Sequence, residues 1–198
     1  MAQAARGAKT RAEMIQAAIR LFALRGYHAT SMNDILEAVS LSKGAFYHHF
    51  SSKEALGLEV LFQVQNDYER QVFGPIRASG PPEERWRRML GKMVELNASG
   101  QWDNCLLLAR LIQEANQQES ELFGQVREAV NRLIEFWREM LEDAQAAHRL
   151  RGDLEVRVLG ELIVATFLGA IGCGELDGAA LRVGEIAGHL ARLLEVSS

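Results

Sequence analysis

The stretch Ser31–Glu54, SMNDILEAVSLSKGAFYHHFSSKE, contains three helix starts within two dozen residues. Each start has a polar residue able to cap a helix, at Ser31, Ser42 and Ser51, followed by apolar residues at helical spacing. Between the first two helices there is room only for a tight turn. Two short helices joined in this way form a helix-turn-helix, whose second helix can lie in the major groove of DNA.

Capping residues place the two helices of this motif. Ser31 and Asp34 have the spacing of a capping box and predict a helix that runs to about Val39. Ser42 is expected to cap a third helix, which covers about residues 43–49.

The chain on either side of the motif also has helical periodicity. Apolar residues recur every three or four positions over about 10–25, and Gly26 stands where a helix-ending glycine belongs. Residues 1–8 are expected to be mobile. A second capping box over 51–54 opens a long fourth helix, which Gly74-Pro75 is expected to end.

The spacing of apolar residues predicts five more helices in the remainder of the chain. The fifth helix contains the apolar residues from Trp86 to Leu96. The sixth to ninth helices cover about 102–116, 119–147, 156–171 and 177–196. Asp153 is expected to cap the eighth helix, and Gly172 and Gly174 to end it. The sequence therefore predicts an all-α fold of about nine helices.

Charge is distributed unevenly along the chain. Residues 1–53 contain seven Lys/Arg and three Asp/Glu, a net charge of +4, whereas the remainder contains 15 basic and 23 acidic residues, a net charge of −8. A basic head on an acidic body fits a head that meets phosphate groups and a body that does not.

The composition is typical of a globular protein, with 48% hydrophobic and 24% charged residues. No apolar run approaches the length that spans a bilayer, and residues 1–14 lack the apolar segment of a signal peptide. The two cysteines are too few for a disulfide framework, and no metal-ligand spacing is present. We therefore expect a cytoplasmic protein with no cofactor, no metal and no membrane partner.

Residues 43–50 combine the side chains that a recognition helix needs. Small residues allow the backbone to approach DNA, a lysine can reach a base edge or a phosphate, and tyrosine and histidine can donate hydrogen bonds to phosphates. Phe46 and Phe50, four positions apart, are expected to anchor the helix in the core. With the neighbouring helix N-termini included, the predicted DNA-contacting residues are Thr30, Ser31, Ser42, Lys43, Gly44, Ala45, Tyr47, His48, His49 and Lys53.

The run TSMNDILEAVSLSKGAFYHHFSSKEAL resembles the helix-turn-helix signature of TetR-type transcriptional regulators, and Gly26-Tyr27 upstream of it fits as well. The signature covers about a quarter of the chain. One departure is Ser40, which stands in the turn where the family commonly has glycine. That position tends to need a positive φ, which costs serine about 1 kcal/mol.

The resemblance implies a nine-helix homodimer that acts as a ligand-released repressor. Residues 1–53 would form the DNA-binding domain together with the start of helix four, and residues 54–198 the ligand-binding and dimerisation domain. Helices eight and nine would pair with those of a second copy, and the dimer would read a near-palindromic operator in grooves about 34 Å apart. The apolar segment ELIVATFLGAIG of the eighth helix agrees with such a face, although it also fits the buried centre of a monomer.

The resemblance also implies a cavity for a small-molecule effector among helices four to eight. The candidate lining residues are Trp86, Met89, Met93, Asn97, Trp102, Cys105, Leu108, Phe123, Phe136, Trp137 and Phe167. Each of them also fits an ordinary core position. Cys105, near the N-terminus of the sixth helix, fits either a reactive thiolate or a small buried side chain.

Two other classes of function compete with DNA binding. A helical enzyme could use Cys105 or a histidine, but the sequence contains no Cys/His/Asp grouping, no Gly-rich phosphate loop and no paired carboxylates, so we expect no enzymatic activity. A helical interaction module would keep the same fold without touching DNA. Substitution of Lys43, Tyr47 and His48 together distinguishes such a module from a DNA-binding protein.

Overall fold

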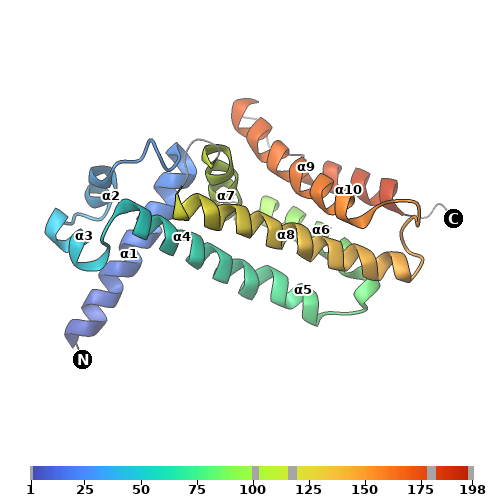
Figure 1. Ribbon diagram of the computed structural model, residues 1–198, viewed down its shortest axis with the longest axis horizontal. Coiled ribbons are helices and arrows are strands. Elements are labelled where there is room, and N and C mark those ends of the chain that lie inside the picture. Colours follow the sequence, from blue (N-terminus) through green and yellow to red (C-terminus); the bar gives the residue numbers. More distant parts are fainter. Residues whose placement is uncertain (1, 100–102, 116–119, 178–181, 196–198) are drawn as a thin grey trace. The chain divides into compact units, whose positions relative to one another are not determined.

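The computed structural model describes residues 2–99, 103–115, 120–177 and 182–195. Within these ranges the chain is helical apart from turns and one isolated bridge, which confirms the predicted all-α fold. Figure 1 shows the helices with their labels, coloured along the chain from the N-terminus to the C-terminus. They belong to two compact units, one formed by 1–66 with 103–127 and the other by 67–102 with 128–198.

The first unit contains the predicted helix-turn-helix. α1 (Ala2–Arg25), α2 (Met32–Ala38) and α3 (Lys43–His49) precede α4 (Lys53–Tyr68). α1 starts at Ala2, earlier than the start near residue 10 that the apolar pattern predicts. Four of residues 2–8 are alanines, which have the highest helix propensity.

Two caps form inside the motif as the sequence predicts. The Ser31 Oγ accepts the Asp34 N–H at 3.1 Å, and the Asp34 carboxylate accepts the Ser31 N–H at 2.6 Å. These two bonds make a complete capping box at the start of α2. The Ser42 Oγ accepts the Ala45 N–H at 3.2 Å and caps α3.

The cap of α4 differs from the prediction by one residue. The Ser52 Oγ accepts the Ala55 N–H at 3.0 Å, so Ser52 is the cap, and the capping box predicted between Ser51 and Glu54 is wrong. Because α4 begins at Lys53, the Glu54 side chain is not positioned to reach back to Ser51. Its carboxylate instead accepts the Leu122 N–H at 3.4 Å, at the start of α8 (Glu121–Ala146).

The turn between α2 and α3 is left-handed at Ser40, as expected. Ser40 has φ 53°, a region that glycine adopts more readily than serine. Its N–H donates to the Glu37 carbonyl oxygen at 3.2 Å, and the Leu41 N–H donates to the Leu36 carbonyl oxygen at 3.0 Å. These two bonds form a Schellman motif, which satisfies the last carbonyl groups of α2.

The fourth helix does not end at Gly74-Pro75, contrary to the prediction. α4 continues through a π-helical turn (Glu69–Phe73) into α5 (Gly74–Ala78), so this part of the chain is one continuous helical run. The Gly74 N–H donates to the Glu69 carbonyl oxygen. This wider turn accommodates Pro75, which lacks an N–H, near the start of α5. With that run counted once, the described residues form nine helices plus a 3-10 turn (Pro82–Glu84).

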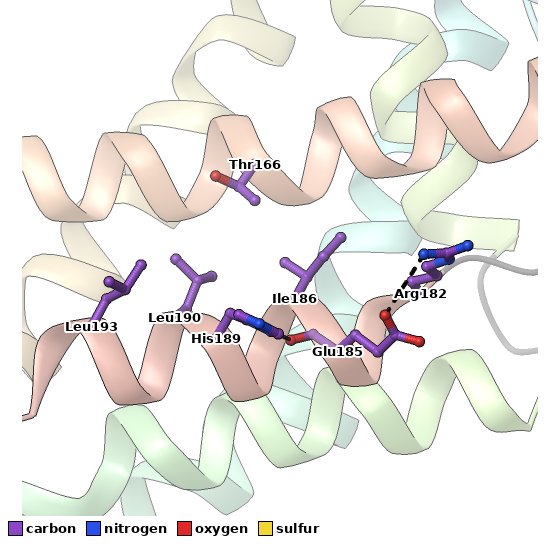
Figure 2. Close-up of a pocket in the computed structure, with 7 residues that line it drawn as sticks. All are labelled: Thr166, Arg182, Glu185, Ile186, His189, Leu190 and Leu193. Atoms are coloured by element: carbon purple, nitrogen blue, oxygen red, sulfur yellow. Dashed lines mark hydrogen bonds and ion pairs between the residues drawn. The ribbon is translucent and has the colours of Figure 1, made fainter.

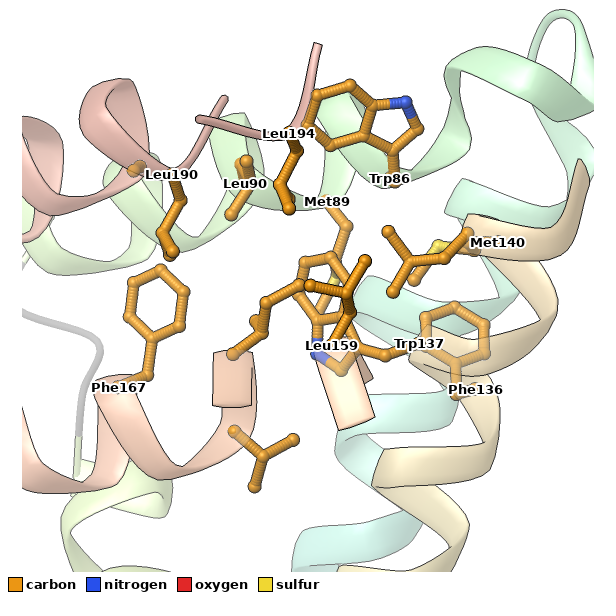
Figure 3. Close-up of a cluster of buried hydrophobic side chains, with 14 of the residues drawn as sticks. Trp86, Met89, Leu90, Phe136, Trp137, Met140, Leu159, Phe167, Leu190 and Leu194 are labelled. Carbon is orange, nitrogen blue, oxygen red and sulfur yellow. The ribbon is translucent and has the colours of Figure 1, made fainter. Parts of the chain in front are cut away.

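The second unit is built on one cluster of buried apolar side chains. α6 (Arg85–Ala98), the later part of α8, α9 (Val156–Asp177) and α10 (Val183–Leu194) all contribute to it. Figure 3 shows Trp86, Met89, Trp137 and Phe167 among its members. α9 passes through Gly172 and Gly174 to Asp177, so the predicted stop at these glycines is wrong.

Asp153 does not cap α9, which begins three residues later at Val156. Its carboxylate accepts hydrogen bonds from the Arg151 guanidinium at 2.7 and 3.1 Å. The described part of the chain contains no helix long and apolar enough to cross a membrane.

Candidate nucleic-acid interface

α3 has one buried and one exposed face. Phe46 and Phe50 are 0% and 4% exposed, and their ring centroids lie 5.6 Å apart, which confirms that they anchor the helix. Tyr47 is a large aromatic side chain and is 61% exposed. Lys43 and His48 are also exposed, so these side chains form a polar surface on the side of α3 away from the core.

The exposed face of α3 carries the positive charge of Lys43. Among the described residues, Lys43 has no carboxylate within ion-pair distance. Arg11 and Arg25 of α1, by contrast, pair with Glu59 at 2.7 Å and with Asp34 at 3.4 Å. Lys43 is therefore available to a phosphate or to a base edge.

Gly44 has no packing role inside the protein. A Cβ at this position would meet only the Ser42 Oγ, at an ordinary distance of 3.8 Å. Because no side chain projects from Gly44, a DNA backbone could approach the backbone of the first turn of α3 closely. Ala45 and His49 are partly buried, and the rings of His48 and His49 lie edge to face with centroids 5.0 Å apart.

Thr30 lies in the core rather than on the surface. Its side chain is 0% exposed, and its hydroxyl donates to the Gly26 carbonyl oxygen at 2.7 Å. This bond holds the turn that connects α1 to α2. We therefore leave Thr30 out of the proposed interface, whereas Ser31 and Ser42 are exposed beside their helix N-termini.

Lys53 begins α4 and is partly buried. Its ammonium lies 4.3 Å from the centroid of the Tyr27 ring, a cation–π contact. Burial lowers the pKa of Lys53, and the nearby carboxylates of Glu114 and Asp34 oppose that shift. Lys53 stays a predicted DNA contact, although much of its side chain is already engaged within the protein.

A groove between α2 and α3 adds residues that the sequence interpretation missed. It has a volume of about 460 Å³, and its lining includes Asn33, Glu37, Ser40 and Lys43. Asn33 and Glu37 are exposed and lie four positions apart, on one face of α2. That spacing on a short helix beside the reading helix could have indicated them from sequence.

The later part of the first unit contacts the head at the turn after α1. α7 (Asp103–Glu114) packs along α1, and the Glu114 carboxylate accepts the His28 N–H at 3.0 Å. Phe123 of α8 lies edge to face with Tyr27, with centroids 5.8 Å apart. Burial, together with Glu54 and Glu114, raises the pKa of Tyr27 to about 12. Because His28 and Glu114 are 86 residues apart, no local pattern predicted this contact.

The predicted ligand-binding residues fall into three groups. Trp86, Met89, Phe136, Trp137 and Phe167 are buried in the cluster of the second unit, and Met93 packs against it. Phe123 and the partly buried Leu108 belong to the first unit. Trp102 and the side chains of Asn97 and Cys105 lie outside the described residues. Apart from the partly buried Met93 and Leu108, the described side chains occupy core positions, and the role of the whole set in ligand binding stays a prediction.

α9 and α10 expose an apolar surface. Val158 and Leu162 are each 52% exposed, and Leu193 is 67% exposed. A groove of about 340 Å³ lies between these helices. Its lining residues, drawn in Figure 2, include Thr166 of α9 and His189 and Leu193 of α10.

Two glycines of α9 have different surroundings. Gly169 has open space around its Cβ position. A Cβ at Gly160 would lie 3.2 Å from the Ile134 carbonyl oxygen, so Gly160 serves packing against α8 instead of approach by another chain.

Comparison with known proteins identifies the family. The sequence model described as "Bacterial regulatory proteins, tetR family" matches residues 14–60, which span the helix-turn-helix. The chain is 30% identical over 167 residues to the HTH-type transcriptional repressor DhaR of Mycobacterium sp. (strain GP1), covering 81% of this chain and 80% of DhaR. The chain belongs to the TetR family.

Solved structures share the whole fold of this TetR-family chain. A TetR-family transcriptional regulator from Agrobacterium tumefaciens superposes with a TM-score of 0.86 at 22% identity, over 96% of this chain and 100% of that one. AibR, solved in complex with isovaleryl coenzyme A and operator DNA, superposes with a TM-score of 0.73 at 22% identity, over 94% and 98% of the two chains. The family model and the similarity to DhaR make the protein a helix-turn-helix transcriptional regulator of this family, and the solved structures show the same fold.

Proposed function

We propose that this TetR-family regulator represses transcription by binding a near-palindromic operator as a homodimer, with α3 of each protomer in a major groove. The observation that carries the proposal is the exposed face of Lys43, Tyr47 and His48 on a helix anchored by Phe46 and Phe50. These side chains supply a cation and hydrogen-bonding groups for phosphates and base edges. AibR, a protein of the same fold, was solved in complex with operator DNA, which supports operator binding by this chain.

The test is DNA binding by the variant Lys43→Ala/Tyr47→Ala/His48→Ala, measured on the DNA immediately upstream of the protein's own reading frame. We expect the affinity to fall at least about tenfold, because a good base contact contributes roughly 1–3 kcal/mol. Since all three side chains are exposed, the fold should persist. The variant Arg70→Gln/Arg149→Gln, which removes two exposed charges from the second unit, is the control. Unchanged affinity in the triple variant would favour an interaction module that does not read DNA through α3.

The homodimer is proposed to form through α9 and α10. Exposed apolar side chains are costly in water, and Val158, Leu162 and Leu193 lie on these two helices. Leu162→Arg with Leu193→Arg should convert a dimer into a monomer, measured by light scattering after gel filtration. Phe62→Arg, at a 58% exposed position on α4, is the matched control. An unchanged mass in the double variant would exclude this face as the interface.

A small-molecule effector is proposed to release the protein from DNA through α7 and α8. These helices hold the turn after α1 through Glu114 and Phe123. A shift of either helix therefore changes how the head is held. Glu114→Gln weakens the acceptor of the His28 N–H, and we expect weaker DNA binding with unchanged helix content. Equal DNA affinity in Glu114→Gln and the wild type would exclude this contact as the connection.

A further inference from the structure

α1 extends well beyond the part of the head that it helps to bury. Of the described side chains of α1, Met14 is the first that is buried, and residues 5–13 are all exposed or partly exposed. At 1.5 Å per residue, the helix before Met14 is about 18 Å long. We name residues 2–13 the N-terminal arm. Burial of apolar surface does not account for it.

The N-terminal arm lies beside the end of the reading helix. A Cβ at Gly7 would lie 3.8 Å from the His49 Cε1. Figure 1 shows the N-terminal half of α1 passing α3 and projecting beyond it. The arm is therefore continuous with the surface through which α3 is proposed to meet DNA.

Arg11 fixes the arm in this place. Its guanidinium contacts both carboxylate oxygens of Glu59, at 3.1 and 2.7 Å, and lies 5.1 Å from the centroid of the Phe50 ring. The hydrogen bond to Glu59 raises the pKa of Arg11. Phe50 follows α3 directly, and this contact ties the position of the arm to that of the reading helix.

The positive charges of the arm contribute little to the stability of the protein. Arg6 and Lys9 are exposed, and no acidic residue precedes Glu13. The Lys9 Nζ lies 3.9 Å from the Glu13 Oε1, and the two side chains are 79% and 49% exposed. An ion pair this exposed contributes little stability. Basic residues near a helix start are also opposed by the helix dipole. Exposed positive charges of this kind suit a negatively charged partner outside the protein.

We propose that the N-terminal arm is a second DNA-contacting element, in which Arg6 and Lys9 bind the sugar-phosphate backbone next to the site read by α3. The proposal rests on the proposed DNA binding by α3. Phosphate contacts add affinity without reading sequence. The arm therefore strengthens binding to every duplex equally and extends the footprint beyond the bases that α3 reaches.

The test compares full-length wild type, Arg6→Gln/Lys9→Gln and the control Arg70→Gln/Arg149→Gln. Two duplexes serve as probes, the DNA upstream of the reading frame and an unrelated sequence of equal length. Fluorescence anisotropy between about 50 and 200 mM salt gives the affinity and its salt dependence. We expect the arm variant to lose the same factor of affinity on both duplexes. Its slope of log affinity against log salt should fall by about 0.9 for each phosphate group that the variant no longer binds.

Each outcome decides a separate point. A wild type that binds neither duplex overturns the proposed function itself. If the wild type binds and the arm variant has the same affinity and salt slope, the arm does not touch DNA. A loss confined to the upstream duplex would also overturn the backbone assignment, because it would indicate base recognition. Arg6→Lys/Lys9→Arg, which keeps both charges, should restore binding, and the single Gln variants carry the test if the double variant unfolds.

Discussion

α3 and α9 each expose one face, and the two faces have opposite chemistry. Phe46 of α3 and Phe50, which follows α3, turn their rings inward, and α3 exposes Lys43, Tyr47 and His48. α9 buries Ile163 and Phe167 and still exposes Leu162. A polar face that carries a lysine suits a charged, hydrated partner such as DNA, whereas an apolar face suits another apolar surface. Both elements are amphipathic α-helices, but the exposed face of α3 suits DNA and that of α9 suits another apolar protein surface.

The two regions are also held together in different ways. The head contains two short helices whose N-terminal N–H groups donate to the hydroxyl oxygens of Ser31 and Ser42, and the Ser52 hydroxyl oxygen accepts such a bond at the start of α4. The second unit contains long helices held by a continuous apolar cluster that includes Trp86 and Trp137. Short helices depend on their caps because few residues lie between the ends, whereas long amphipathic helices derive their stability from the buried face.

The largest expected effects come from one substitution made in both regions. Phe46 and Phe136 are 0% and 4% exposed, and truncating either to alanine should lower the free energy of unfolding by about 3–5 kcal/mol. Phe46→Ala should also abolish DNA binding, because it loosens α3, and leave protomer association intact. Urea unfolding, DNA binding and light scattering measure the three properties.

Phe62→Ala is the control for this pair. Phe62 is 58% exposed, so its truncation should change the free energy of unfolding by less than about 0.5 kcal/mol. If Phe46→Ala and Phe136→Ala lose DNA binding and association to the same extent, the division of roles between the two regions is wrong.

A smaller effect is expected at the start of α4. Ser52→Ala removes the acceptor of the Ala55 N–H and should lower the free energy of unfolding by about 1 kcal/mol. Ser51→Ala, one residue earlier, should have almost no effect, because α4 starts at Lys53. Urea unfolding of the two variants distinguishes the observed cap from the capping box that the sequence suggested. Equal losses in both variants would contradict the observed cap.

The head could be predicted closely because its interactions are local. The bonds of the caps at Ser31 and Ser42 connect residues three positions apart, so the sequence pattern contains both partners. Interactions over long separations were not predictable in this way. The Glu114 carboxylate reaches the His28 N–H across 86 residues, and the burial of Thr30 depends on the path of the turn after α1.

The second unit could be predicted as helices but not at their ends. A glycine in a helix interior costs about 1 kcal/mol, which burial of neighbouring side chains on a long helix can outweigh. α9 accordingly continues past Gly172. The π-helical turn ends at Phe73, and the chain continues as the helix α5, which contains Pro75. Trp86 and Phe136 illustrate a further difficulty. Apolar residues at helical spacing form the same pattern whether they fill a core or line a pocket, so the sequence does not separate these roles.

Ser40 provides a still smaller test, with the opposite sign. Its φ of 53° is strained for any residue with a Cβ, so Ser40→Gly should raise the free energy of unfolding by up to about 1 kcal/mol. Ser40→Ala keeps the Cβ and should give no such gain. Thermal and urea unfolding of the two variants measure the difference. A gain in Ser40→Ala equal to that in Ser40→Gly would show that the strain is not the cause.

The smallest effect is the pH dependence of the α2 cap. Hydrogen bonds from the Ser31 hydroxyl and the Ser31 N–H, with a contribution from Arg25, lower the pKa of Asp34 below its usual value of 3.8. A carboxyl group whose pKa is lower in the folded protein stabilises the fold above its unfolded pKa, and this stabilisation is lost as the pH falls through the folded pKa. Asp34→Asn should therefore be less stable than the wild type at neutral pH, and the difference should shrink below about pH 4. An NMR titration of the Asp34 carboxyl carbon measures the pKa directly. Ser31→Ala should return it towards 3.8, and a pKa unmoved by that substitution would mean that the capping box does not cause the shift.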